Sequence, residues 1–233
     1  MTNSLENKVA VITGAQGGLG NFMTEGFLSA GSAVVGVARS IQQSAFSHPK
    51  FLALPTDLTR GDSSKELAAN VIAKFGRIDV LVHVMGGFAG GELVDDTDDA
   101  TWDKMMNLNV RSAFNITRAV LPHMRKAKHG RVIAVGARSA VEPKAYLSAY
   151  CASKAALVSL IRTVALEGKE DGITANVILP GTMDTPANRA DSPSADPSKW
   201  VPPSKVASLA LWLASDQASE ISGALIPVYG AGL

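Results

Sequence analysis

The sequence predicts a single α/β domain with a doubly wound parallel sheet of about seven strands and helices on both faces. Two patterns along the chain indicate this. Strand-like and helix-like segments alternate, as in a parallel sheet whose strands are joined by helical crossovers. The strand-like segments are continuously apolar, as strands buried on both faces must be. The chain length of 233 residues fits one such domain, so residues 1–233 are expected to form one unit.

The elements can be assigned in order along the chain. Residues 9–13 form a short β-branched run that leads into glycines, and residues 19–30 have helical spacing and stop at Gly31. Further strands are expected at residues 33–38, 51–54, 79–84, 131–135, 173–179 and 224–228. Further helices are expected at residues 65–75, 102–128 (in one piece or two), 148–169 and 203–214.

The composition narrows the functional class. A net charge of +1 gives no strong field toward nucleic acid or an anionic membrane. Cys151, the single cysteine, has no internal disulfide partner, which suits a reducing compartment. The first eight residues hold no apolar signal region, and no uninterrupted apolar run reaches the ~18 residues of a membrane span. A cytoplasmic protein that binds neither nucleic acid nor membrane is therefore expected.

The stretch "TGAQGGLG" lies between the first expected strand and the first expected helix. Such a tight turn requires glycine, and it brings free backbone N–H groups at a helix start toward a bound diphosphate. In this strand–turn–helix setting the motif predicts a Rossmann-type nucleotide site rather than a purely structural turn. The residues expected to contact the nucleotide here are Gly14, Gln16, Gly18, Leu19 and Gly20.

The end of the second strand indicates which nucleotide binds. A carboxylate there would favour NAD(H), but the chain has Ala38 followed by Arg39 and Ser40. Because arginine can bind a 2′-phosphate with two hydrogen bonds, NADP(H) is favoured over NAD(H); the alternative is a solvated arginine. Asp57 and Leu58, after the third strand, are expected at the adenine, and the alternative for Asp57 is a turn or N-cap role.

Four motifs together resemble the short-chain dehydrogenase/reductase family over nearly the full chain. They are T-G-x-x-x-G-x-G at residues 13–20, Asn109 in "LNVRSAF", Y-x-x-x-K at residues 150–154 and P-G-x-x-x-T at residues 180–185. The resemblance implies a homodimer or homotetramer, formed through the helices at residues 102–128 and 148–169.

The resemblance also implies roles for individual residues. Tyr150 would be the general acid/base, and Lys154 would hold the nicotinamide ribose and lower the tyrosine pKa. Spacing by four residues puts both side chains on one helix face; the alternative for Tyr150 is a packed core tyrosine. Asn109 would support a water-linked proton path, and Thr185 would bind the nicotinamide carboxamide. The remaining cofactor contacts implied are Gly86, Pro180 and Gly181.

The chain departs from the family at two positions. The usual N-N-A-G reads His83-Val84-Met85-Gly86, and a hydrogen-bonded structural role for His83 is expected over a second acid. The other histidines lack metal-ligand spacing, so no metal site is expected. The family's active-site serine is replaced by Ala137, which removes one donor to a developing oxyanion. Ser139 lies ~7 Å further along an extended strand, so it can take over only if the turn bends it back.

Three stretches resemble one branch of the family, dihydropteridine reductase, which lacks this serine. They are "VMGGFAGG" at residues 84–91, "GARSAVE" at residues 136–142 and "DTPANRADSPSADPSKW" at residues 184–200. This resemblance implies a flat dihydropterin substrate. Phe88 or Trp200 could stack on such a ring, and Tyr146 would line the pocket or pack beside it. That branch uses NADH, whereas this chain has Arg39.

Three hypotheses of function remain open. The first is an NAD(P)H-dependent oxidoreductase that transfers hydride to a small cyclic or carbonyl substrate, with a dihydropterin as one candidate. The second is a ketone reductase of the 3-oxoacyl or sugar type. The third, from another class, is a non-catalytic NADP(H)-binding sensor or scaffold. For the enzymes, residues 181–203, called the lid below, are expected to cover the site; the alternative is an ordinary surface loop.

Overall fold

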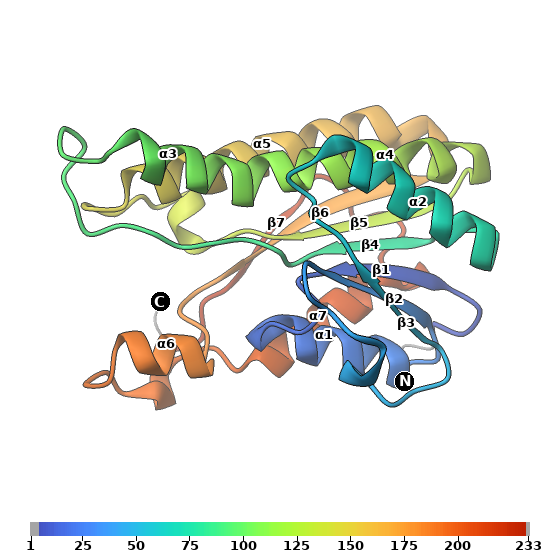
Figure 1. The fold of residues 1–233 in the computed structure, drawn as a ribbon, viewed down its shortest axis with the longest axis horizontal. Helices are drawn as coiled ribbons and strands as arrows, with labels where there is room; N and C mark the ends of the chain where they lie inside the picture. Colours follow the sequence, from blue (N-terminus) through green and yellow to red (C-terminus); the bar gives the residue numbers. More distant parts are fainter. Residues whose placement is uncertain (1–4, 232–233) are drawn as a thin grey trace.

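The computed structural model describes residues 5–231, which contain one sheet of seven parallel strands. The strands lie in the order β3-β2-β1-β4-β5-β6-β7 (Figure 1). The chain thus builds one half outward from β1 to β3, then returns beside β1 and builds the other half. The bounds are β1 Val9–Thr13, β2 Ala33–Ala38, β3 Phe51–Pro55, β4 Val80–His83, β5 Gly130–Val135, β6 Ile173–Pro180 and β7 Leu225–Val228. The predicted doubly wound sheet is confirmed.

Helices cover both faces of the sheet (Figure 1). α2, α4 and α5 pack on one face, and α1 and α7 pack on the other. α6 lies beyond the edge of the sheet, in the lid. The bounds are α1 Gly18–Ser29, α2 Gly61–Phe75, α3 Asp99–Met106, α4 Ser112–Ala127, α5 Ser148–Gly168, α6 Pro186–Asp191 and α7 Pro203–Ala214.

The central strand β1 shows why the strands are continuously apolar. Val9 and Val11 join the core under α2, α4 and α5. Ala10 and Ile12 join the core under α1 and α7. Successive side chains of a strand point to opposite faces, so a strand covered on both faces needs apolar residues at every position.

The helix expected over residues 102–128 forms two pieces joined by a wider turn. α3 ends at Met106, and α4 begins at Ser112. Between them, Asn107–Arg111 form a π-helical turn. Such turns are rare and often occur at functional sites. This one contains Asn109, the residue that the family resemblance assigned to a proton path.

The helix expected at residues 65–75 begins earlier, at Gly61. Its first residues, Gly-Asp-Ser-Ser, are weak helix formers, so propensity did not indicate the extra turn. Gly61 packs closely against α4: a Cβ at this position would lie 2.6 Å from an Arg118 side-chain nitrogen. Tertiary packing therefore extends the helix past the apolar pattern.

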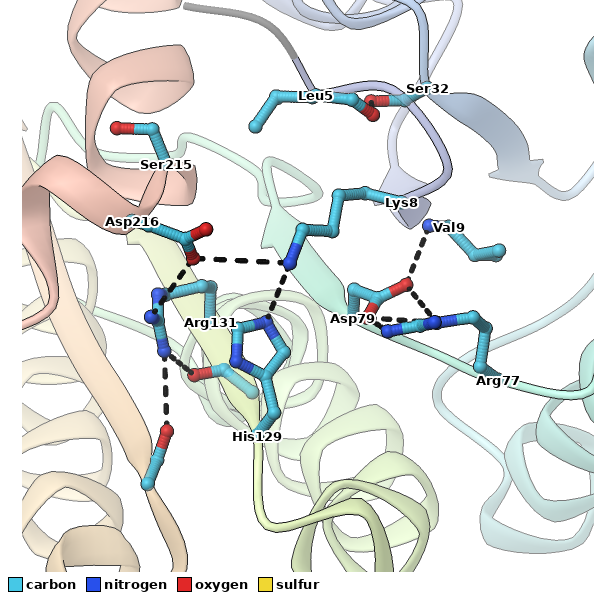
Figure 2. Close-up of polar contacts among 12 residues, drawn as sticks. Leu5, Lys8, Val9, Ser32, Arg77, Asp79, His129, Arg131, Ser215 and Asp216 are labelled. Carbon is cyan, nitrogen blue, oxygen red and sulfur yellow. Dashed lines mark hydrogen bonds and ion pairs between the residues drawn. The ribbon is translucent and has the colours of Figure 1, made fainter.

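A group of charged side chains, of which Asp79 and Arg131 are buried, lies at the amino ends of the strands (Figure 2). Asp79, just before β4, accepts a 2.8 Å hydrogen bond from the Val9 backbone N–H. The Nε of Arg77 donates to the same carboxylate at 2.8 and 3.0 Å, and this raises the pKa of Arg77. The pair neutralises a buried carboxylate and ties the start of β1 to the start of β4.

Asp216 pairs with two basic side chains in the same region, Arg131 and Lys8 (Figure 2). Its Oδ1 lies 3.6 Å from a guanidinium nitrogen of Arg131 and 3.9 Å from Lys8 Nζ. Lys8 Nζ is also 3.4 Å from His129 Nε2. Burial, followed by the charges of Arg131 and Lys8, lowers the pKa of His129, which favours the neutral ring that accepts from Lys8. These contacts join β5 to the segment after α7.

The helical segment from Ser148 to Asp171 is long and apolar enough to cross a membrane, with a mean hydropathy of 1.3. Half of the most apolar stretch is buried within the fold. Core helices pass the same test of length and composition, so this feature assigns no membrane role.

Candidate active site

A cleft of about 770 Å³ lies at the carboxyl ends of the strands. This edge is where doubly wound sheets bind ligands. The cleft brings together many of the predicted residues: Gly14, Gln16, Gly18, Leu19, Gly20, Gly86, Phe88, Tyr150, Lys154 and Thr185. Sequence reasoning missed the remaining lining: Gly17, Asn21, Phe22, Val84, Met85, Gly87, Val135, Gly136, Met183, Pro186 and Ala187. Most of these flank a motif residue, and that proximity was the available signal.

The glycine turn leaves room for a ligand to approach the backbone closely. Gly14 has a φ of +66°, in the left-handed region that favours glycine. A Cβ on Gly20 would lie 1.9 Å from the Gly14 carbonyl oxygen, and a Cβ on Gly18 would lie 3.1 Å from the Thr185 side chain. The turn opens α1, whose free N–H groups favour an anion. These residues fit the diphosphate of a dinucleotide.

Thr13 connects this turn to the segment after β4. Its Oγ1 accepts from the N–H groups of Val84 and Met85, each at 3.1 Å, and lies 3.0 Å from His83 Nδ1. Because both lone pairs are engaged, the hydroxyl donates to Nδ1, and a neutral ring carries its proton on Nε2. Nε2 is buried and has no hydrogen-bond partner among residues 5–231. Burial, followed by the charge of Lys154, lowers the pKa of His83 to about 3, which agrees with a structural histidine.

Tyr150 and Lys154 lie one turn apart in α5, and both border the cleft. Burial lowers the pKa of Lys154 to about 8, and its Nζ donates to the Val135 carbonyl at 3.1 Å. Burial, then the neighbouring Cys151, raises the pKa of Tyr150 to about 12. This shift is opposite to the one expected from a lysine neighbour, because desolvation of the phenolate outweighs the other effects. The phenol is therefore protonated at neutral pH.

Ser139 reaches Tyr150. Residues Arg138–Ala140 form a single 3₁₀ turn after Ala137, which is still extended. This turn bends the chain back, so the side chain of Ser139 hydrogen-bonds that of Tyr150 and lowers its pKa, against the larger effect of burial. Ala137 is buried beside it. Ser139 is therefore within reach of Tyr150, and its use in place of the missing serine stays a prediction.

Asn109 holds the segment after β4 in place by hydrogen bonds to Gly87. Its Oδ1 accepts from the Gly87 N–H at 2.8 Å, and its Nδ2 donates to the Gly87 carbonyl at 3.1 Å. Nδ2 also donates to Ser153 Oγ at 2.9 Å, and Ser153 donates to the Tyr150 carbonyl at 2.8 Å. Asn109 thus joins the π-helical turn, the glycine segment and α5. Ser153 had no signal in the sequence beyond its place inside Y-x-x-x-K.

The three aromatic residues expected at the substrate occupy different positions. Phe88 lines the cleft and packs edge-on against Tyr150, with ring centroids 5.0 Å apart. Tyr146, with a φ of +66°, lines a separate pocket of about 370 Å³ beside the segment after β4. Trp200 follows the short 3₁₀ turn Pro197–Lys199 in the lid and is not among the residues that border the cleft. Phe88 is thus the expected substrate residue whose ring packs on Tyr150 at the cleft.

The residues expected at the adenosine lie beyond the cleft. Arg39 and Ser40 are exposed just after β2, and the charge of Arg39 contributes to a lowered pKa of Asp57. The larger cause is Thr59, whose N–H and hydroxyl donate to Asp57 Oδ1 at 3.0 and 2.7 Å. Asp57 therefore takes part in a turn, and its expected contact with the adenine stays a prediction. Leu58 is buried in the core, and its expected contact with the cofactor stays a prediction.

Pro180 and Gly181 lead from β6 into the lid, and the ends of the lid are joined. The Gly181 N–H donates to the Val228 carbonyl at 3.0 Å. Met183 and Val201 form an isolated parallel bridge. Within it, the Val201 N–H donates to Thr182 at 2.8 Å, and Asp184 donates to Val201 at 2.9 Å.

The D-T-P-x-N-R stretch is a helix start. Thr185 is the N-cap of α6, with its Oγ1 accepting from the Asn188 N–H at 3.3 Å, and Pro186 opens the first turn. Asn188 Nδ2 donates to the Met183 carbonyl at 2.8 Å. Arg189 binds both carboxylate oxygens of Asp184, at 2.6 and 2.9 Å. All five residues that the motif specifies therefore have a local structural role.

A larger groove of about 1040 Å³ lies at the opposite end of the strands, near Arg131 and Ile173. It contains none of the residues that the motifs indicate. Within residues 5–231, no three His, Cys, Asp or Glu side chains are grouped to hold a metal ion. The chemistry is therefore sought at the smaller cleft, where the glycine turn meets Tyr150 and Lys154.

Comparisons with known proteins agree with this geometry. The family model described as short chain dehydrogenase matches residues 8–196. The 3-oxoacyl-acyl-carrier-protein reductase FabG of Salmonella typhimurium is 32% identical, over 97% of this chain and 98% of that protein. The short-chain dehydrogenase/reductase olcF of Penicillium canescens is 32% identical, over 98% and 97%. The crystal structure of gox2181 superposes with a TM-score of 0.92 at 27% identity, covering 99% of this chain and 97% of that one. The chain belongs to the short-chain dehydrogenase family and is an NAD(P)-dependent oxidoreductase.

Proposed function

We propose that this protein is an NADPH-dependent reductase of a small carbonyl compound, with Tyr150 as the general acid and Ser139 as the second donor to the substrate oxygen. The observation that carries the proposal is the 3₁₀ turn after Ala137, which bends the chain back so that the Ser139 side chain reaches that of Tyr150 and lowers its pKa. Tyr150 borders the cleft and Ser139 lies next to Tyr150, so both hydroxyl groups could donate to one carbonyl oxygen bound there. This is the arrangement that a developing alkoxide requires.

The cofactor assignment rests on the glycine turn and on Arg39. Gly14, Gly18 and Gly20 would hold the diphosphate, Lys154 the nicotinamide ribose and Thr185 the carboxamide. Arg39 would bind the 2′-phosphate, since its guanidinium is exposed directly after β2. Bound NADPH supplies the hydride.

The protein side chains supply the proton and hold the oxygen. With a pKa raised to about 12, Tyr150 carries its proton at neutral pH and can donate it. Lys154 lies on the same face of α5 as Tyr150, and its ammonium group would stabilise the phenolate that Tyr150 becomes. Asn109 and Ser153 hold α5 against Gly87, so the two reacting side chains keep their place. Asn109 is also our candidate for a water-linked proton path.

A dihydropterin is the second candidate substrate. The exposed Phe88 ring at the cleft favours it, because an aromatic face could pack on a flat heterocycle. The lid motif, however, is explained by local hydrogen bonds around Thr185 and Asp184. A shared motif of this kind carries no information about the substrate. The names of the relatives, among them 3-oxoacyl-acyl-carrier-protein reductase, support the carbonyl class.

The remaining expectations follow the family. We propose a homo-oligomer formed through α4 and α5, a cytoplasmic location, and a lid at residues 181–203 that closes over the cleft. The test of function is NADPH consumption with a 3-oxoacyl thioester, a cyclic diketone and a quinonoid dihydropterin. Turnover of a ketone that is lost in Ser139→Ala supports the proposal. Turnover of the dihydropterin alone favours the second candidate, and cofactor binding without turnover of any substrate favours a sensor.

A further inference from the structure

Arg138 stands next to Ser139 and belongs to none of the family motifs. Its Nε donates to Glu142 Oε2 at 2.6 Å, one helical turn along the chain. Its guanidinium carbon lies 4.6 Å from the centroid of the Tyr229 ring. An arginine stacked on an aromatic face and paired with a carboxylate is held from two directions.

Glu142 and Tyr229 are themselves held in place by backbone contacts. The Glu142 N–H donates to the Arg138 carbonyl at 2.9 Å, so the ion pair and a backbone bond close the same turn. Tyr229 follows β7, and its backbone packs on Gly181: a Cβ on Gly181 would lie 3.1 Å from the Tyr229 carbonyl oxygen. The guanidinium therefore attaches the turn after β5 to the end of β7.

The position of Ser139 depends on this turn. Ala137 is extended, with φ −162° and ψ 157°, and the next residues reverse the chain. Backbone bonds from Ala140 to Ala137 at 3.0 Å and from Val141 to Arg138 at 3.1 Å hold the reversal. If the chain stayed extended, Ser139 would lie ~7 Å further along and would not reach Tyr150.

We propose that Arg138 is a positioning residue for catalysis: the Glu142–Arg138–Tyr229 contacts hold the turn that keeps the Ser139 hydroxyl on Tyr150. The inference rests on the proposed function, since it assumes that Ser139 is used. It gives this chain a means of keeping a serine in the active site after the family position became alanine. Arg138 touches neither substrate nor cofactor in this role.

The test is a double-mutant cycle on the full protein with the best ketone. Arg138→Ala is expected to lower kcat roughly tenfold, because a small misplacement of a reacting group is costly, while the Kd for NADPH stays unchanged. In Ser139→Ala, adding Arg138→Ala should cause no further loss, since the residue acts through Ser139. Arg125→Ala is the matched control, because Arg125 pairs with Asp171 away from the cleft.

Tyr229 gives an independent check that leaves Arg138 in place. Tyr229→Phe keeps the ring face and should keep kcat, whereas Tyr229→Ala should lower kcat as Arg138→Ala does. The proposal is overturned if Arg138→Ala and Tyr229→Ala both keep the wild-type kcat, or if the Arg138 and Ser139 effects multiply. If Ser139→Ala itself is fully active, the proposed catalytic use of Ser139 has failed instead.

Discussion

Ser139 hydrogen-bonds Tyr150 although it stands two residues beyond the position where the family carries its serine. If this hydroxyl is the second donor to the substrate oxygen, Ser139→Ala should lower kcat on a ketone by about 10²–10³, the usual cost of one oxyanion donor. Moving the hydroxyl back, in Ala137→Ser combined with Ser139→Ala, should restore part of that loss. Steady-state kinetics of the three variants measure this. Equal kcat in Ser139→Ala and wild type would remove the second donor from the mechanism.

Tyr150→Phe removes the proton donor and its hydrogen bond with Ser139, and it keeps the ring. Phe88 packs against the ring rather than the hydroxyl, so the fold and the cleft should be retained. We expect turnover to fall to background, with the Kd for NADPH within about twofold, which is well under 1 kcal/mol. Fluorescence titration and a turnover assay give both quantities, and substantial turnover by the variant would contradict the acid role.

The pH dependence of turnover should report Lys154. Reduction needs Tyr150 protonated and Lys154 charged, and their pKa values are about 12 and about 8. Activity is therefore expected to be level below pH 8 and to fall as the pH rises through 8, when the ammonium is lost. Lys154→Arg, which stays charged, should move the fall upward in whatever activity remains. A wild-type profile that stays level up to pH 10 would argue against a lysine contribution.

Arg39→Ala should weaken NADPH binding by about tenfold or more, in line with a lost charge-assisted hydrogen bond of about 1.5–3 kcal/mol. NADH lacks the 2′-phosphate, so its Kd should not change and serves as the internal control. Titration of both cofactors with both proteins gives the four constants. A wild type that prefers NADH would refute the cofactor assignment directly.

The buried His83 should make the protein sensitive to acid. The pKa of His83 is about 3 in the folded protein, against an ordinary value of 6.5. Between pH 6.5 and pH 3, His83 therefore takes up a proton in the unfolded chain but not in the folded protein. The free energy of unfolding should fall by about 1.4 kcal/mol per pH unit as the pH drops from 6.5 toward 3. His83→Asn can still accept from Thr13 and should flatten this slope in denaturant titrations. The same slope in both proteins would assign the acid sensitivity to other groups.

Most strands and helices could be predicted from the local pattern of apolar residues in the sequence. The strands were recognisable because both faces are buried, and the helix of residues 203–214 was predicted with its observed bounds. The start of α2 and the π-helical turn were missed as such, because packing against Arg118 and the contacts of Asn109 determine them. Helix α6 was missed because its stabilising contacts are caps rather than an apolar stripe.

The active site was likewise predictable only where it depends on residues close together in the sequence. Spacing indicated the glycine turn and the pair Tyr150–Lys154, since both depend on residues near in sequence. Ser139 can reach Tyr150 only if the chain bends back after Ala137. In our proposal that bend is held by contacts of Arg138 with Glu142 and with Tyr229, which lies far along the chain. The upward shift of the Tyr150 pKa depends on burial by neighbouring elements. A single sequence shows neither directly.

The bridge between Met183 and Val201 has a consequence for how such enzymes diverge. Because both ends of the lid meet at this bridge, β6 and α7 are set by contacts that do not pass through the intervening residues. An insertion, deletion or exchange between the end of α6 at Asp191 and the bridge at Val201 keeps Thr185 in place and leaves the sheet and the cofactor half of the cleft in register. Substrate range can therefore evolve by replacing one closed segment, independently of the machinery that moves hydride and proton.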